Sequence, residues 1–187
     1  DAIKFENVKY VVNDDYNTTE QLFSLMTARS FFSGELIVAY GDIIYDRKIL
    51  EKIVNCKDDF LLAVDKNWEK SYEKRQDNPA ILADFIGLNK GKVSECFTNL
   101  NKDNIDFDEI VEFIGLIKLS SNASSAFLRR YLAMEEFDKK SVEEMKLIVF
   151  FESLRKNKVN ISTFNVKNRW FEIDTQQDLE IARKLFK

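Results

Sequence analysis

Apolar runs alternate with amphipathic stretches along the first third of the chain. Residues 8–12, 36–40 and 60–64 are rich in β-branched, leucine and aromatic side chains, which predicts strands. Between them, apolar residues recur at helical spacing over 22–28, and a second helix is predicted over 47–54. Residues 36–40 show no alternation of apolar and polar side chains, as expected of a central strand covered on both faces. This order favours parallel strands joined by helical crossovers.

The pattern changes in the middle of the chain. Strands over 81–88 and 93–97, joined by Asn89-Lys90-Gly91-Lys92, predict an antiparallel hairpin, and Gly115 in a strand over 113–117 indicates a close backbone approach. The last third predicts helices over 125–137 and 142–156, strands over 159–166 and 170–173, and a terminal helix from about residue 176. We therefore expect one α/β domain over 1–187, with a mixed, mostly parallel sheet flanked by helices.

Composition narrows the function classes. The 187 residues are 45% hydrophobic, enough for one buried core, and 28 basic against 32 acidic residues give a net charge of -4. No basic field therefore draws in nucleic acid or anionic lipid. Cys56 and Cys96 lie far apart, which favours a reducing compartment over a disulfide framework. Without an apolar run of about 18 residues or a signal-like start, we expect a cytoplasmic protein with no membrane contact.

The chain contains no histidine. Ser/His/Asp and Cys/His catalysis by this chain alone are therefore excluded, and its chemistry must use carboxylates, lysines, tyrosines or a metal. Two aspartates stand out, because Asp42 ends the strand over 36–40 and Asp174 ends the strand over 170–173. Ligands of open α/β sheets bind beyond the carboxyl ends of strands, so this pair is placed to share one divalent cation. The alternative is a turn or helix-capping aspartate for Asp42 and a helix-capping aspartate for Asp174.

Five stretches in order carry a resemblance to a known family. They are Asn17-Thr18-Thr19 with Leu22 and Ser24-Leu25; Tyr40-Gly41-Asp42-Ile43-Ile44-Tyr45-Asp46; Ala63-Val64-Asp65; Trp68 with Tyr72 and Arg75; and Trp170-Phe171-Glu172-Ile173-Asp174-Thr175 with Asp178-Leu179. Each is weak alone, but their order and spacing are jointly specific. With them the chain resembles nucleotidyltransferases of the phosphocholine and aminoethylphosphonate cytidylyltransferase type, relatives of sugar-1-phosphate nucleotidyltransferases with a Rossmann-like fold.

The resemblance implies a function and a metal site. Asp42 and Asp174 would be the paired ligands of a catalytic Mg²⁺, because an anionic acceptor must approach an anionic phosphate and positive charge has to neutralise both. Asn17, Thr18 and Thr19, followed along the chain by Gly41, would belong to the nucleotide site, where amide and hydroxyl groups hydrogen-bond a pyrimidine edge. A turn and helix cap is the equal alternative for the first three.

The same resemblance suggests acceptor contacts. Trp68, Tyr72, Phe85 and Trp170 would form an aromatic wall that holds a trimethylammonium group by cation–π attraction, with core packing as the alternative for at least two of them. Arg75 shares a helix face with Tyr72 and would grip the acceptor's phosphate, and a surface ion pair is the alternative.

Three more acidic residues are weaker candidates. Glu172 would support the metal ligands. Asp46 and Asp65 sit beside polar neighbours in predicted loops, where solvation explains them equally well.

The glycine-rich loop, arginine and Lys-Pro segment that open this family do not occur here, and the five glycines are scattered. We therefore expect a piece of a longer protein that lacks its N-terminal nucleotide-binding segment, with loss of nucleotide binding as the alternative. The expected reaction joins CTP to a small phosphorylated or phosphonate acceptor, phosphocholine-like, with release of pyrophosphate. A sugar-1-phosphate nucleotidyltransferase and a non-catalytic binding module remain alternatives. The acceptor, the base and the oligomeric state, a homodimer included, stay open.

Overall fold

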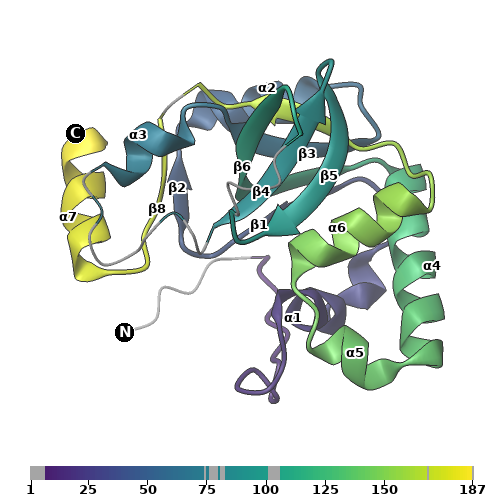
Figure 1. Ribbon diagram of the computed structural model, residues 1–187. Helices are drawn as coiled ribbons and strands as arrows, with labels where there is room; N and C mark the ends of the chain where they lie inside the picture. The colour runs from purple at the N-terminus through teal and green to yellow at the C-terminus, as the bar shows by residue number, and fades with distance from the viewer. Residues whose placement is uncertain are drawn as a thin grey trace.

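The computed structural model describes residues 7–73, 75, 80, 83–100, 106–167 and 169–186. No helix in these ranges is both long enough and apolar enough to cross a membrane. The described elements, in chain order (Figure 1), are α1 (Gln21–Thr27), the 3₁₀ helix η1 (Arg29–Phe31), β1 (Leu36–Ala39), β2 (Ile43–Tyr45), α2 (Arg47–Asn55), β3 (Phe60–Asp65), α3 (Trp68–Tyr72), β4 (Asp84–Asn89), β5 (Lys92–Thr98), β6 (Glu109–Leu119), α4 (Ser121–Phe137), α5 (Lys139–Glu143), α6 (Leu147–Lys156), β7 (Ser162–Asn165), β8 (Trp170–Glu172) and α7 (Gln176–Leu185).

The main sheet has the strand order β5-β4-β6-β3-β7, and β1 also pairs with β6. The expected mixed α/β sheet flanked by helices is confirmed. The expected excess of parallel pairing is wrong for the described strands, because β3 and β7 form their only parallel ladder. The physical reason is the long strand β6, which runs opposite to β1, β3 and β4 and so makes three antiparallel ladders.

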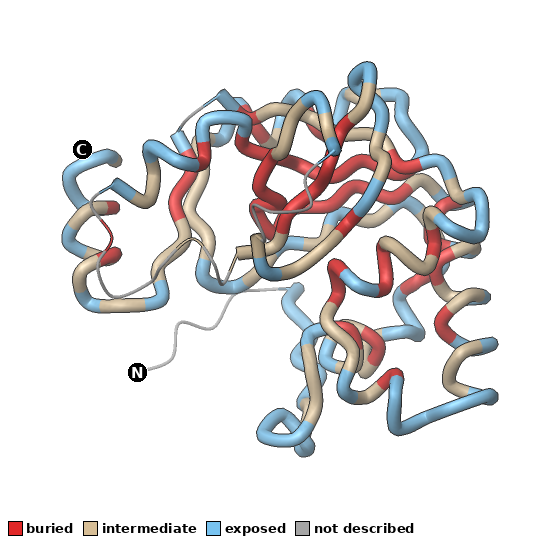
Figure 2. Tube along the Cα trace, in the orientation of Figure 1, coloured by how far each residue is buried: buried red, intermediate tan, exposed pale blue. Residues whose placement is uncertain are grey.

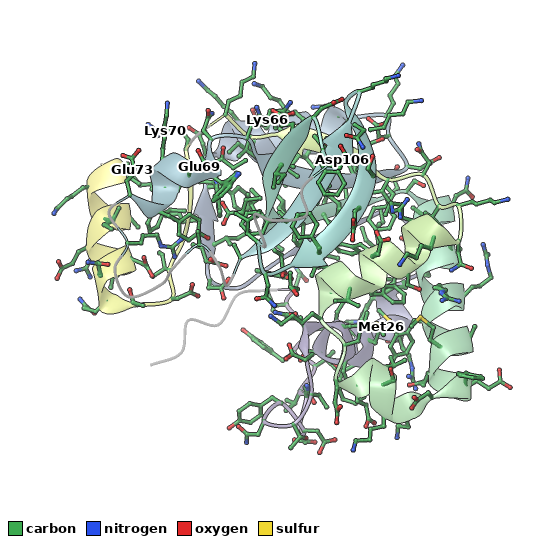
Figure 3. The ribbon with its side chains drawn as sticks, in the orientation of Figure 1. Met26, Lys66, Glu69, Lys70, Glu73 and Asp106 are labelled. Atoms are coloured by element: carbon green, nitrogen blue, oxygen red, sulfur yellow. The ribbon has the colours of Figure 1, made fainter. Side chains whose placement is uncertain are left out.

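The strands at the centre of this sheet are buried (Figure 2), and apolar clusters lie on both of its faces. On one face, the larger cluster joins β3 and β6 to helices α1, α4 and α6, with Met26 and Phe127 in its interior. Figure 3 shows Met26 among these helices. On the other face, Ile49 and Ile53 of α2 complete a smaller cluster with β3 and β6. The strands of the sheet centre therefore lie between two apolar layers.

Gly115 lies within the long strand β6. Its φ of 79° is a left-handed conformation that favours glycine, and a Cβ there would lie 2.6 Å from the Tyr40 ring. The Tyr40 amide donates a hydrogen bond to the Gly115 carbonyl at 2.9 Å. β4 pairs with β6 before this glycine and β1 pairs with β6 after it. The predicted close approach is confirmed. The Tyr40–Gly115 hydrogen bond holds the end of β1, two residues before Asp42, against β6.

Several other predictions from the pattern are also confirmed. The helices α1, α2, α4 and α7, the strands β3, β7 and β8, and the β4–β5 hairpin lie where the sequence places them. Residues 81 and 82 of the predicted hairpin lie outside the described residues.

Three predictions are wrong. Residues 8–12 form no strand, and Tyr10 and Val12 are exposed. β1 is half-buried and pairs with β6 alone among the described strands, so it is not a central strand covered on both faces. The helix predicted over 142–156 is two helices, because the chain turns extended at Lys146, where φ is -66° and ψ is 147°.

Candidate active site

A short two-stranded ladder brings Asp42 and Asp174 together. β2 follows Asp42 directly and pairs antiparallel with β8, which ends just before Ile173. The Ile173 amide donates a hydrogen bond to the Asp42 carbonyl at 2.9 Å. Both aspartates line one cavity of about 550 Å³, bounded also by the end of β1 and the start of α1. The two residues, far apart in the chain, therefore face a common space.

Neither aspartate caps a helix. Asp42 lies in the turn between β1 and β2. The N-cap of α7 is Thr175, whose hydroxyl accepts a hydrogen bond from the Asp178 amide, while the Asp178 carboxylate accepts one from the Thr175 amide in a capping box. The Asp174 amide also donates to Asp178, at 3.2 Å. This removes the helix-cap explanation for both residues.

Glu172 lies beside the pair. It lines the first cavity together with Asp42 and Asp174, and its side chain is 27% exposed. Burial and the neighbouring negative charge of Asp174 raise the pKa of Glu172 to about 7. With Glu20, which lines the same cavity, these residues make an acidic wall of four side chains that favours a bound cation.

Arg75 stands behind this wall as a buried partner. Its side chain is 1% exposed, and its Nε donates to Asp178 Oδ1 at 2.9 Å. Its Nη2 lies 3.6 Å from Asp174 Oδ2 and 3.9 Å from Glu172 Oε2. The guanidinium also lies over the ring of Phe171, 5.1 Å from the centroid. The surface ion pair considered for Arg75 is therefore wrong, and the guanidinium links α7 to the acidic wall.

The predicted aromatic wall is divided between core and cavity. The indole of Trp68 is buried, donates to the Ile110 carbonyl at 3.1 Å and packs 4.9 Å from Phe85 between ring centroids. Neither residue lines the two cavities at the acidic wall. The other face of α3 carries the exposed side chains of Glu69 and Lys70 (Figure 3). Core packing therefore explains Trp68 and Phe85.

Trp170 reaches both the core and a cavity. It is buried, its indole donates to Asp65 Oδ2 at 2.8 Å, and it lines a second cavity of about 400 Å³. Asp65 is 2% exposed and also accepts from the Asn67 amide, so it is not a solvated loop residue. Asp46 caps α2 through the Lys48 amide, at 3.0 Å. Both of these aspartates therefore have structural partners.

The predicted nucleotide loop has a partial relation to the first cavity. Thr19 lines it, and so does Gly41, whereas Asn17 and Thr18 are absent from its lining. The hydroxyls of Thr18 and Thr19 both donate to the Asp15 carbonyl, at 3.2 and 2.9 Å. These bonds shape a turn, as the alternative reading of this loop expected.

The second cavity adjoins the first, and both are lined by Gln21, Tyr40, Glu172 and Asp174. Sequence reasoning missed most of its polar residues. Glu112 is one of them: its carboxylate accepts a hydrogen bond from the Tyr72 hydroxyl at 2.5 Å, and burial raises its pKa to about 8. The signal was available, because Glu112 is a charged residue inside the apolar run of β6.

Two residues that line this second cavity carry buried polar atoms without partners. The Glu112 Oε2 oxygen and the Tyr40 hydroxyl have no hydrogen-bond partner in the described part of the chain. A buried polar group left unpaired costs about 1–3 kcal/mol. Asp84 lines the same cavity, and burial raises its pKa to about 6 although the charge of Lys146 acts in the opposite direction. The cavity is therefore acidic and has unmet hydrogen-bonding capacity.

The acidic side chains of the first cavity can be compared with the ligands that a metal ion needs. Within the described ranges, no group of three or more acidic, cysteine or histidine side chains is placed to hold a metal ion by itself. Mg²⁺ is commonly bound through one or two carboxylates together with substrate phosphates and water. Asp42 and Asp174 on one cavity fit a magnesium ion that is held jointly with a phosphate-bearing substrate.

Comparison with solved structures defines the fold. The inositol-1-phosphate CTP transferase from T. maritima has a TM-score of 0.64 and 15% identity, over 94% of this chain and 64% of that one. The CTP:phosphocholine cytidylyltransferase from Streptococcus pneumoniae has a TM-score of 0.64 and 10% identity, over 94% of this chain and 67% of that one. The chain therefore has the Rossmann-like nucleotidyltransferase fold, and it spans less than two thirds of the T. maritima protein.

A sequence relative agrees with the fold. A CTP:phosphoglutamine cytidylyltransferase of Campylobacter jejuni subsp. jejuni serotype O:2 is 28% identical over 188 residues, which are 95% of this chain and 73% of that protein. No protein-family profile matches the chain. The resemblance to cytidylyltransferase-type nucleotidyltransferases is confirmed.

Proposed function

We propose that the complete protein transfers the cytidylyl group of CTP to a small phosphorylated or phosphonate acceptor and releases pyrophosphate, with Mg²⁺ held by Asp42 and Asp174. The observation that carries this proposal is the meeting of these two carboxylates on one cavity in a chain with the nucleotidyltransferase fold. The similarity to a cytidylyltransferase over 95% of the chain favours CTP as the nucleotide.

Each side chain has a role that follows from its position. The β2–β8 ladder fixes Asp42 next to the Asp174 segment, and Arg75 holds Asp174 from the buried side. When bound, Mg²⁺ supplies the positive charge that lets the anionic acceptor approach the α-phosphate. Thr19 and Gln21 bound the first cavity on the α1 side, where the Gln21 side-chain amide suits hydrogen bonds to a nucleotide. The second cavity is left for the acceptor.

Substitution of the two aspartates tests this proposal. In the full-length protein, Asp42→Asn and Asp174→Asn remove the charge that holds Mg²⁺ but keep the side-chain shape. We expect each to lower kcat/KM for CTP by at least about a hundredfold, measured as pyrophosphate release at saturating acceptor. Asp138→Asn is the matched control, because Asp138 caps α5 away from both cavities and asparagine caps a helix equally well. Full turnover in both site variants would contradict the proposal.

The same protein distinguishes the alternatives. UTP or GTP with sugar 1-phosphates, used in place of CTP, tests for a sugar-1-phosphate nucleotidyltransferase. Calorimetry with CTP and Mg²⁺ tests for a binding module, because a folded full-length protein that takes up neither has no nucleotide site. Turnover with CTP above that with the other nucleotides supports the proposed function.

A further inference from the structure

We propose that Glu112 and Tyr40 determine acceptor specificity by binding an N–H-bearing cationic group, such as a primary ammonium, at the end of the acceptor distant from its phosphate. This inference rests on the proposed function. The second cavity is then the acceptor site. Glu112 of β6 and Tyr40, directly after β1, recognise the acceptor's nitrogen.

Charge points to a cation. Four acidic residues line the second cavity, Asp84, Glu112, Glu172 and Asp174, against the single lysine Lys146 of that lining. Burial raises the pKa of Glu112, and a cation bound beside it would favour its ionised form. The aromatic rings of the cavity's lining present faces that also attract cations. These rings belong to Tyr40, Tyr72, Phe113 and Trp170.

Unpaired oxygens decide which cation fits. Glu112 is 2% exposed, and its Oε1 already accepts from Tyr72 at 2.5 Å, so its Oε2 is the atom left to bind a ligand. The Tyr40 hydroxyl is the second buried oxygen without a partner among the described residues. A primary ammonium carries three N–H donors for oxygens of this kind, whereas a trimethylammonium group has none. The pair therefore favours an amine over a quaternary nitrogen.

Position fits the same assignment. Tyr40, Glu172 and Asp174 line both cavities, so a molecule in the second cavity touches the wall that it shares with the first. In this placement the acceptor's phosphate would lie at the Mg²⁺ that Asp42 and Asp174 would hold, and its nitrogen at Glu112. The volume of about 400 Å³ suits a small molecule.

Matched acceptors test the inference in the full-length protein. Ethanolamine phosphate and choline phosphate share one skeleton and differ in their –NH₃⁺ and –N(CH₃)₃⁺ groups. We expect kcat/KM at least tenfold higher for the amine. Glu112→Gln and Tyr40→Phe should each lower kcat/KM for the amine about tenfold, mainly through KM, and change the value for choline phosphate less than twofold.

Controls separate recognition from folding. Tyr40→Phe removes a hydroxyl without a described partner, so the variant should fold as stably as the parent. Tyr131→Phe is the matched control, because the Tyr131 hydroxyl donates to Glu135 at 2.9 Å, away from the cavity. It should leave the amine-to-quaternary ratio unchanged.

The outcomes are distinct for the two proposals. Three results would overturn this inference alone. They are a preference for choline phosphate, an equal effect of Glu112→Gln on both acceptors, and no calorimetric binding of ethanolamine phosphate to a protein that is active with CTP. A protein that neither binds CTP nor releases pyrophosphate with any acceptor would remove the proposed function and this inference with it.

Discussion

Arg75 is the residue at which α3, β8 and α7 are tied together. Its guanidinium is buried and donates to the equally buried Asp178 at 2.9 Å, with a second hydrogen bond to the Glu172 carbonyl at 3.4 Å. Burial opposes ionisation of Asp178, but the hydrogen bonds from Arg75 and Thr175 outweigh it and lower the pKa of that carboxyl. The pair is thus charged and enclosed, and its two members depend on each other.

Removing one member should be costly. Arg75→Met keeps much of the side-chain volume but leaves Asp178 buried without its cation, so we expect a loss of about 3–5 kcal/mol in the free energy of unfolding. Arg29→Met is the control, because its ion pair with Glu135 is half-exposed and should contribute less than about 1 kcal/mol. Urea unfolding of both variants measures the difference. A loss of unfolding free energy in Arg75→Met no larger than that in Arg29→Met would show that the Arg75 ion pair does not stabilise the fold more than an exposed pair does.

At the scale of elements, the close approach of Gly115 in β6 to Tyr40 invites a direct test. Gly115→Ala forces a side chain into a left-handed conformation and brings its Cβ to 2.6 Å from the Tyr40 ring. We expect a loss of roughly 1–3 kcal/mol in unfolding free energy. Gly34→Ala is the control, because no atom lies within 4 Å of its added Cβ. Unfolding midpoints in urea compare the two, and a Gly115 variant as stable as the control would contradict the close approach.

Elements with strong local patterns were predictable from the sequence. α2 has a clear apolar stripe, β3 is a continuous apolar run, and the β4–β5 hairpin is marked by the turn at Lys90-Gly91. Strand direction was not predictable, because a buried apolar run looks the same whether its neighbours are parallel or antiparallel. The direction of β6 therefore determines that most ladders of the sheet are antiparallel, and no local signal in the sequence gives this direction.

The candidate site divides in the same way. Asp42 and Asp174 were predictable because each follows a strand, and strand ends are where ligands bind in this class of fold. Tyr40 was not predicted as a binding residue, because it ends an apolar run where packing is the ordinary explanation. Glu112 was marked by its charge within the apolar run of β6, but nothing in the sequence places it near the other site residues. Their importance appears only when β1, β6 and β8 are brought around one cavity.

At the scale of the whole molecule, the acidic cavities set the pH dependence of stability. Burial raises the pKa of Asp84 to about 6, of Glu172 to about 7 and of Glu112 to about 8, above the values of 3.8 and 4.5 that these side chains have when free. Between about pH 4 and pH 8 the folded protein therefore binds more protons than the unfolded chain. Stability from these groups is complete at the acidic end of that window and is lost as pH rises through the folded pKa values.

A second set of carboxyls acts at lower pH. Hydrogen bonds lower the pKa of Asp58, and those from Arg155 lower the pKa of Glu152 against the effect of burial. Their contribution is lost as pH falls through these lowered values, so we expect maximal stability near pH 4–5 and a decline toward pH 8. Thermal unfolding from pH 3 to pH 9 measures the curve. Glu112→Gln carries no titrating proton, so its decline above pH 6 should be shallower than that of the parent. Parallel curves would show that Glu112 ionises in the folded protein as it does in the unfolded chain, and that its burial does not govern this part of the profile.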